Sequence, residues 1–257
     1  MQISFRKSLQ ETWKIWTEHF LKFLTITTIV IFCIYLFSTA GVGALFYEFQ
    51  KIGKDALSWH SGVTYFLLLS LVAVIFVQLW GFLSLLVLVA KRGEISAHDA
   101  ITGAKNFFFD FLVLLFLQIL LYSLAALVGY IFVAIIGGVV GLIGGVNFLN
   151  NYYAWLGIFP IISTTVMAFY LMFSPFCLID KKLFPWQALK ASFSMVQGNF
   201  WRIVWRVTLA SAIIIIAAII LSYTPYIGYA LAGIIVIPTL FIYAHVLYEK
   251  LKNGASN

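Results

Sequence analysis

The chain has 257 residues, of which 63% are hydrophobic and only 10% are charged, and its mean hydropathy is +1.03. Soluble domains carry roughly 25% charged residues, so this chain has too little polar surface to cover itself in water. Its net charge of +7 comes from Lys and Arg residues that flank apolar runs. This pattern indicates a membrane protein and excludes nucleic acid as the expected partner.

Six apolar runs are long enough to cross a bilayer, which takes about 18 residues or more. They cover residues 23–47, 63–90, 107–145, 155–177, 203–223 and 226–248. They leave no room for a soluble domain, so we expect one integral membrane domain over residues 1–257. The apolar core of a signal peptide has about 7–15 residues. The first run is longer and follows a polar segment, so it is predicted to be a retained span.

The segments before the first and fifth runs are predicted to be amphipathic helices that lie in the membrane interface. Large apolar residues recur in both at steps of three and four, the spacing that lines one face of a helix. The first stripe consists of Phe5, Leu9, Trp13, Trp16 and Phe20, and the second of Trp186, Leu189, Phe193, Val196 and Phe200.

The third run has 39 residues, or about 58 Å as a helix, against a hydrocarbon core about 30 Å thick. We expect one long helix that continues beyond the bilayer, or a helix that breaks near Gly137. Gly137, Gly141 and Gly145 form a doubled GxxxG pattern, which favours close helix packing; a flexible gate or a re-entrant turn is the alternative. An external turn is expected at residues 147–151.

The stretch FSMVQGNFWRIVWR, residues 193–206, is interpreted as an elbow where an interfacial helix turns into the membrane. Gly198 and Asn199 are expected to supply the bend or a new helix cap. The predicted interfacial anchors are Trp13, Trp16, Phe193, Trp201 and Trp205. The residues expected to hold anionic lipid headgroups are Lys14, Lys22, Lys190, Arg202 and Arg206.

An internal repeat underlies this arrangement. When residues 8–23 are set against residues 188–203 without a gap, Trp13 meets Phe193, His19 meets Asn199, and Lys22 meets Arg202. A shorter copy, AITGAKNFFFDF, occupies residues 100–111. The predicted fold is therefore an all-α, polytopic bundle of six transmembrane helices. It is built as three units of interfacial helix plus transmembrane hairpin, near 1–90, 91–178 and 179–250.

The distribution of basic residues predicts the orientation of these helices. Fourteen of the sixteen Lys and Arg residues lie on alternate connections and at the termini, and the other two, Lys51 and Lys54, lie on the opposite side. Because cytoplasmic loops carry the excess of Lys and Arg, both termini are expected in the cytoplasm.

The stretch ALKASFSMVQGNFW before a span, together with the repeated unit of interfacial helix plus hairpin, resembles a bacterial membrane family. This family comprises the multi-helix domain attached to some glycerophosphodiester phosphodiesterases and its freestanding, uncharacterised relatives. The resemblance implies a protein of the bacterial cytoplasmic membrane that is concerned with lipid or envelope homeostasis. The catalytic domain of the phosphodiesterases has no counterpart here, so the resemblance carries over no catalytic residue.

Three polar residues within the runs are candidates for a polar pathway: Gln78, Asp110 and Gln118. Their alternative roles are interhelical hydrogen bonding for the two glutamines and an interfacial carboxylate for Asp110. His245 and Glu249, one turn apart, are interpreted as a surface pair. The sequence contains no catalytic or metal-binding motif, so we expect no catalytic residue, metal or cofactor.

Two functions fit this pattern. The first is a non-enzymatic protein that acts through contact with membrane lipids, anionic ones in particular, or with other envelope proteins or further copies of itself. The second is a small transporter, or a flippase-like protein, for an amphiphilic substrate. A polar cavity lined by Gln78, Asp110 and Gln118 would favour transport, whereas a dry bundle with splayed amphipathic helices would favour lipid contact.

Overall fold

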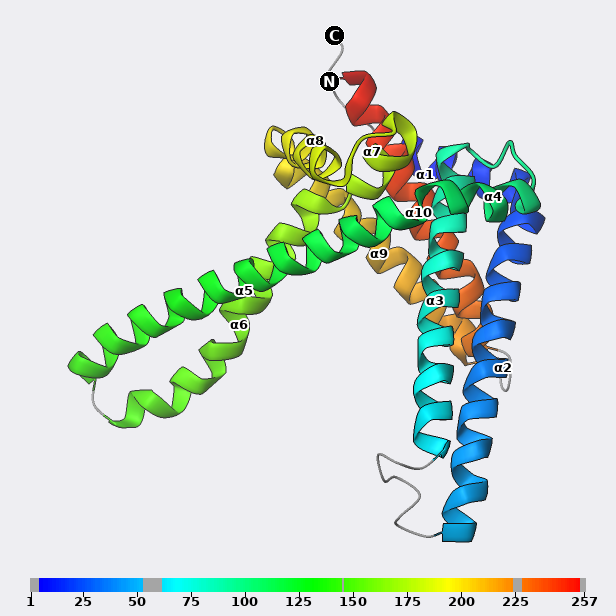
Figure 1. The fold of residues 1–257 in the computed structure, drawn as a ribbon. Coiled ribbons are helices and arrows are strands. Elements are labelled where there is room, and N and C mark those ends of the chain that lie inside the picture. Colours follow the sequence, from blue (N-terminus) through cyan, green and yellow to red (C-terminus); the bar gives the residue numbers. More distant parts are fainter. Residues whose placement is uncertain (1–4, 53–61, 145, 224–227, 255–257) are drawn as a thin grey trace. The chain divides into compact units, whose positions relative to one another are not determined.

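The computed structural model describes residues 5–52, 62–144, 146–223 and 228–254, and every regular element in them is helical. In chain order the helices are α1 (Phe5–Glu18), α2 (Phe20–Ile52), α3 (Gly62–Ala90), α4 (Ala97–Ala104), the 3-10 turn η2 (Lys105–Phe107), α5 (Phe108–Gly144), α6 (Val146–Leu171), α7 (Ser174–Lys181), α8 (Pro185–Gln197), α9 (Phe200–Ser222) and α10 (Gly228–Gly254) (Figure 1). The chain forms two compact units. We call them the α2–α3 unit (Arg6–Phe108 with Ala212–Tyr243) and the α5–α8 unit (Phe109–Ser211 with Ala244–Asn257).

Five helical segments within the described residues are long and apolar enough to cross a membrane. They are Phe20–Thr39, Thr64–Ala90, Ala97–Gly138, Gly157–Lys181 and Phe200–Ile220. A helix satisfies its own backbone hydrogen bonds, which is a requirement for any segment that spans lipid. The predicted all-helical membrane protein is thus confirmed with five candidate spans. The sixth predicted run lies in α10 and is not among them.

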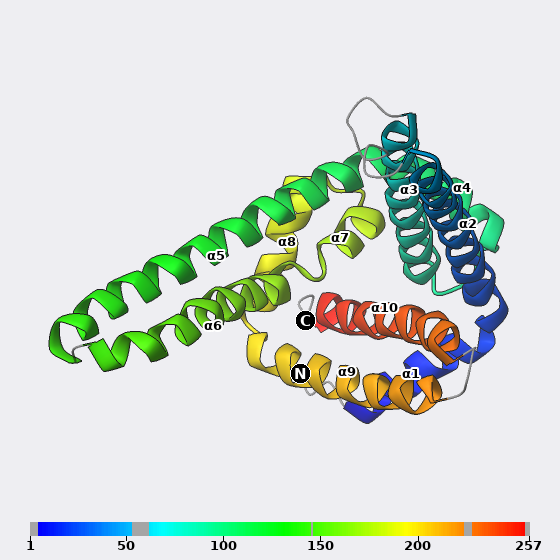
Figure 2. The same ribbon diagram turned by 90° about the horizontal axis from the view of Figure 1, so that it is seen from below.

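The α2–α3 unit is built on a hairpin whose two helices lie side by side in both views (Figures 1 and 2). Its core lies at the end where α4 packs on α3, and the C-terminal end of α3 is buried on all sides from Leu83 to Val89. Ser96 caps α4: its Oγ accepts the Asp99 backbone N–H over 3.1 Å and donates to Asp99 Oδ2 over 2.7 Å. This reciprocal pair fixes the start of α4.

The α5–α8 unit contains a second hairpin, formed by α5 and α6, which also run side by side in both views (Figures 1 and 2). Helix α5 is continuous from Phe108 to Gly144, so the prediction of one long helix is confirmed and there is no break near Gly137. The turn expected at residues 147–151 is wrong, because these residues are the first turns of α6.

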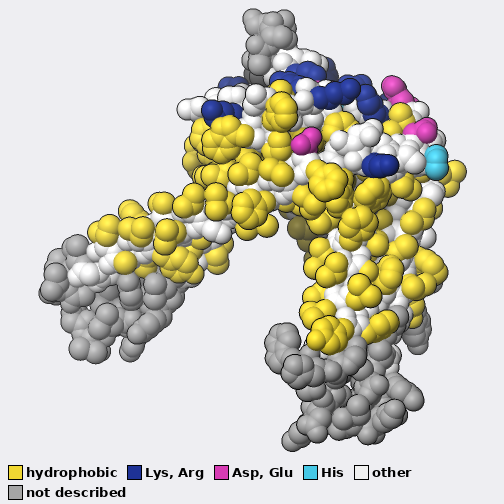
Figure 3. Space-filling view, viewed as in Figure 1, with side chains coloured by type: hydrophobic (Ala, Val, Ile, Leu, Met, Phe, Trp, Pro, Cys, Tyr) yellow, Lys and Arg dark blue, Asp and Glu magenta, His cyan; other side chains and the backbone are white. Residues whose placement is uncertain are grey.

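On the face shown in Figure 3, apolar side chains cover the described part of each hairpin, taken on its own, whereas Lys and Arg side chains lie near the hairpin bases. Exposed residues of this kind on α5 include Phe116, Ile119 and Ile135. Such a surface is too apolar for water, and it suits the acyl chains of a bilayer.

Short helices precede three of the long ones. Helix α1 ends at Glu18 before α2, α4 and η2 lead into α5, and α8 ends at Gln197 before α9 begins at Phe200. The bend predicted at Gly198 and Asn199 is confirmed, since these two residues separate α8 from α9. The Asn199 carbonyl accepts the Ile203 N–H over 3.0 Å, which starts the hydrogen-bond ladder of α9.

Candidate functional site

The most elaborate polar site in the α5–α8 unit lies where the fourth apolar run is interrupted. Pro175, at the start of α7, has no backbone N–H. In a continuous helix its ring would also clash with the carbonyl group four residues earlier. The helix therefore stops at Leu171 and restarts at Ser174. The break leaves backbone groups of residues 170–173 without helical partners, in a largely buried place where an unpaired group costs about 1–3 kcal/mol.

Gln118 of α5 supplies part of the missing pairing. Its Nε2 donates to Ser174 Oγ over 2.7 Å and lies 3.4 Å from the Leu171 carbonyl oxygen. Ser174 Oγ donates to the same carbonyl over 2.6 Å. The carbonyl that Pro175 deprives of its N–H donor is thus satisfied by two side chains.

Ser192 of α8 supplies the other hydrogen-bond partners at the break. Its Oγ donates to the Tyr170 carbonyl over 2.7 Å and accepts the Phe173 N–H over 3.2 Å. One hydroxyl therefore satisfies an acceptor and a donor on the two sides of the break. Ser192, Ser174 and Gln118 are all buried.

Aromatic rings close over this polar site. Tyr170 stacks on Phe193 of α8, with ring centroids 4.5 Å apart, and on Phe200 of α9, at 5.1 Å. Phe173 and Phe176 pack against Tyr248 of α10. The aromatic residues of the elbow therefore fasten α8 and the start of α9 to the end of α6.

The end of α7 is tied to α10 by a carboxylate. Asp180 Oδ2 accepts from Tyr248 Oη over 2.9 Å and from Lys252 Nζ over 2.6 Å. His245, interpreted from sequence as a surface residue paired with Glu249, is only 2% exposed and packs on Phe176. That interpretation is wrong because α7 covers this side of α10, which the sequence of α10 alone does not reveal.

A surface groove lies beside the polar site, between α5, α6 and α8. We call it the Lys190 groove. Its volume is about 170 Å³, and it is lined by Leu121, Met167, Leu171, Trp186, Leu189, Lys190 and Phe193. The Lys190 ammonium lies 5.5 Å from the centroid of the Trp186 ring, within the range of a cation–π contact.

A second, largely apolar cavity of about 350 Å³ lies in the α2–α3 unit, between its hairpin and α4. Val30 and Cys33 of α2, Trp80 of α3 and Ile101 of α4 are among its walls. The hydroxyl of Ser84, also on its wall, donates to the Trp80 carbonyl. Cys33 and Cys177 are both free thiols.

The predicted aromatic anchors divide into two groups. Trp201 is 79% exposed, Trp205 and Trp13 are also well exposed, and Phe193 is 41% exposed. Trp16 is half-buried: its ring stacks on Trp13, with centroids 5.5 Å apart, and meets Phe20 at a tilted angle, with centroids 4.7 Å apart. Four of the five anchors thus present most or much of their ring to the surroundings.

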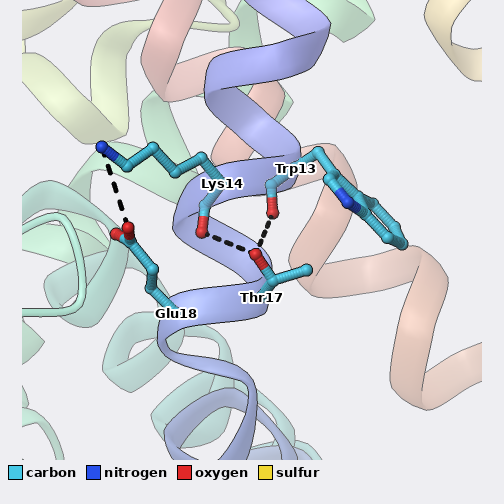
Figure 4. Close-up of polar contacts among 4 residues, drawn as sticks. All are labelled: Trp13, Lys14, Thr17 and Glu18. Atoms are coloured by element: carbon cyan, nitrogen blue, oxygen red, sulfur yellow. Dashed lines mark hydrogen bonds and ion pairs between the residues drawn. The ribbon is translucent and has the colours of Figure 1, made fainter.

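The predicted headgroup ligands lie in both units. Lys14 is exposed and pairs with Glu18 one turn later, over 3.8 Å (Figure 4). Lys22 is engaged in structure, because its Nζ donates to the Gly93 carbonyl over 2.6 Å. In the α5–α8 unit Lys190 and Arg202 are exposed and Arg206 is half-buried. Lys190 and Arg202 are the most accessible of these three for a headgroup, because their side chains are exposed.

The glycine that permits close packing of α5 on α6 is Gly129. A Cβ atom at this position would lie 2.7 Å from the Pro160 Cα atom and 2.8 Å from its nitrogen. By contrast, a Cβ atom at Gly138 would meet nothing within 4 Å. Of the predicted GxxxG residues, Gly137 is half-buried, and the surroundings of Gly141 and Gly145 lie outside the described residues.

The three residues of the predicted polar pathway have separate surroundings. Gln118 is buried in the polar site, whereas Asp110 is exposed in the first turn of α5. Gln78 is exposed on α3, in the other unit. None of the three lines the Lys190 groove or the apolar cavity.

No protein-family model, curated protein or solved structure matches this chain. Within the described residues no group of three or more His, Cys, Asp and Glu side chains is placed to hold a metal ion.

Sequence reasoning missed Gly129, the buried serines and the role of Pro175 as the origin of the polar site. A signal for the last was present: a proline within an apolar run, with a Ser beside it and a Gln in the preceding run that could pair with the freed backbone.

Proposed function

We propose that this chain is a non-enzymatic, multi-pass protein of the bacterial cytoplasmic membrane that acts through contact with anionic lipids at the cytoplasmic leaflet. In this proposal six helices span the membrane in three units of interfacial helix plus hairpin, and both termini are cytoplasmic. The resemblance to the membrane domain of bacterial glycerophosphodiester phosphodiesterases is part of the proposal, and it suggests a role in lipid or envelope homeostasis.

The observation that carries the proposal is the orientation of α8 and the start of α9. The side of α8 that packs on protein consists of Pro185, Ala188, Leu189, Ser192 and Val196. The exposed side includes aromatic and basic side chains beside the polar Gln187, Ser194 and Gln197: Trp186, Lys190, Phe193, Trp201, Arg202 and Trp205. Exposed Trp rings beside Lys and Arg suit the headgroup level of a bilayer, where the ring is buried and the charge stays near phosphate.

A recurring burial pattern supports the repeat. Each short helix buries two small residues four positions apart: Ser8 and Thr12 in α1, Ala100 and Ala104 in α4, and Ala188 and Ser192 in α8. In the ungapped alignment Ser8 meets Ala188 and Thr12 meets Ser192, while the exposed Trp13 meets the exposed Phe193. The break before α2 at His19 also coincides with the break before α9 at Asn199.

The alternative, a transporter, has less support. Proton or sodium coupling needs membrane-buried carboxylates, and the candidate acid, Asp110, is exposed near the start of its helix. The Gln118 amide is engaged in closing the α6–α7 break. Lipid contact accounts for the exposed aromatic and basic residues, which transport would leave without a role.

Native mass spectrometry of the gently purified protein tests the proposal. The wild type is compared with the triple variant Lys190→Gln, Arg202→Gln, Arg206→Gln and with the charge-retaining triple variant Lys190→Arg, Arg202→Lys, Arg206→Lys. We expect the wild type and the charge-retaining variant to carry anionic phospholipid that the Gln variant has lost. Equal lipid content in all three proteins would contradict the proposal and make transport assays the next step.

A further inference from the structure

The Lys190 groove combines an apolar floor with one positive charge. Leu171 and Leu189 are buried at its base, whereas Trp186, Lys190 and Phe193 are exposed. Two of its three walls, α5 and α6, belong to candidate membrane spans. In the proposed topology the groove would therefore face hydrocarbon, and its lysine would lie at the headgroup layer.

We propose that this groove holds part of one acyl chain of an anionic phospholipid, whose phosphate binds the Lys190 ammonium. The inference rests on the proposed function and names a site and a ligand class for it. It assigns α8 a binding role in addition to its role as a membrane anchor.

The size of the groove favours a chain over a compact ligand. Pockets for drug-sized molecules have volumes of about 300–1,000 Å³, and this groove, at about 170 Å³, is smaller. A linear apolar segment that enters from the bilayer can fill it while the rest of the lipid stays in the leaflet. The larger cavity under α4 has no Lys or Arg on its wall, so nothing there selects a headgroup.

The charge of Lys190 favours a phosphate. Its ammonium is held over the Trp186 ring, which attracts a cation but supplies no negative charge. Among the described residues no carboxylate lies within ion-pairing distance of Lys190. By contrast, Lys14 pairs with Glu18 and Lys252 pairs with Asp180. An anionic headgroup would complete the charge balance, and lysine is a common phosphate ligand.

The groove is also preorganised, because contacts within the protein hold its lining residues in place. Leu171 is the residue at which α6 stops, and its carbonyl is fixed by Gln118 and Ser174. Phe193 is held by the stacked ring of Tyr170, and Ser192 ties α8 to the break. A lipid would meet a rigid surface and would lose little affinity to ordering of the protein.

The test is a lipid titration of the purified protein followed by native mass spectrometry. The probes are phosphatidylglycerol and phosphatidylcholine with identical acyl chains. The variants are Lys190→Gln, Lys190→Arg and Met167→Trp, which fills the groove. The control is Ile161→Trp, a substitution of the same kind on the exposed side of α6.

We expect the wild type to bind phosphatidylglycerol more tightly than phosphatidylcholine by about fivefold, the factor that one lysine near an anionic surface contributes. Lys190→Gln should abolish this preference, Lys190→Arg should keep it, and Met167→Trp should remove the tightest-bound lipid of either kind. Ile161→Trp should behave as the wild type. Glycerol 1-phosphate should not displace the lipid; displacement would overturn the acyl-chain part of the inference.

The outcomes separate this inference from the broader function. If Lys190→Gln and Met167→Trp bind phosphatidylglycerol as the wild type does, while the Gln triple variant loses it, the groove assignment is wrong and the proposed function stands. If all variants, the triple one included, keep the same anionic lipid, both proposals are wrong.

Discussion

Gln118 Nε2 of α5 lies 2.7 Å from Ser174 Oγ, at the point where Pro175 interrupts the fourth apolar run. This contact joins residues 56 positions apart in the chain. Gln118, in the middle of a candidate span, therefore supports the break between α6 and α7. This structural role differs from lining a transport path.

Replacement of Gln118 by Leu should destabilise the protein by about 0.6–1.7 kcal/mol, the range for one interhelical hydrogen bond in a membrane protein. Gln78→Leu, at an exposed position of α3, should leave stability unchanged or raise it. The measurement is SDS-induced unfolding in mixed micelles, followed by tryptophan fluorescence. Equal effects of the two substitutions would show that Gln118 does not support the break.

Ser192→Ala should lower the free energy of unfolding by more, about 1–3 kcal/mol. The substitution leaves both the Tyr170 carbonyl and the Phe173 N–H without a partner in a buried place. Alanine is a good helix former, so a loss cannot come from helix propensity. Ser194→Ala is the matched control: Ser194 is exposed and bonds only to the Ala191 carbonyl of its own helix. The same unfolding titration compares the two, and a Ser192→Ala protein as stable as the control would contradict this account.

Gly129→Ala should destabilise the α5–α6 hairpin by about 1–3 kcal/mol, the usual cost of overpacking. The new methyl group would collide with the backbone of Pro160, which cannot move without displacing α6. Gly138→Ala on the same helix meets open space and should stabilise α5 by up to about 1 kcal/mol. Thermal unfolding in detergent gives the sign of each effect. Two changes of the same sign would argue against close packing at Gly129.

Gly93→Ala should destabilise the α2–α3 unit by at least about 1–2 kcal/mol, the cost of a left-handed conformation for a residue with a Cβ atom. Gly93 has a φ of 77°, and an added Cβ would strike the His19 side chain. Lys22 would also lose its bond to the Gly93 carbonyl if the loop moved. Gly198→Ala, at a φ of −85° in open space, serves as the control and should change the thermal unfolding midpoint little.

The sequence predicted the helices well because a bilayer imposes a minimum length and an apolar composition on each span. The sequence left open whether α5 continues past Gly137, because glycines there are compatible with a long helix and with a break, and the structure shows the long helix. A break in lipid needs partners for the freed backbone. The break at Pro175 has such partners, but they come from α5 and α8, and one sequence does not reveal which distant polar residues will meet.

The orientation of the short helices was harder to predict for a different reason. In water an apolar stripe marks the side that faces protein, but at a membrane both lipid and protein are apolar. The stripe of Trp186 and Phe193 is therefore ambiguous, and the structure exposes both residues. The protein-facing side combines two stripe residues, Leu189 and Val196, with the small residues Ala188 and Ser192.

The break at Pro175 has a consequence for synthesis. The hydroxyl that completes the pairing of the Phe173 N–H belongs to Ser192, nineteen residues later in the chain. While the ribosome is still producing α8, the segment before it enters the membrane with open backbone groups that only water or the translocation machinery can satisfy. The α5–α6 hairpin therefore reaches its final state only after α8, which is not a candidate span, has been made and has docked. The last step of insertion of the hairpin thus follows the end of the hairpin's own translation.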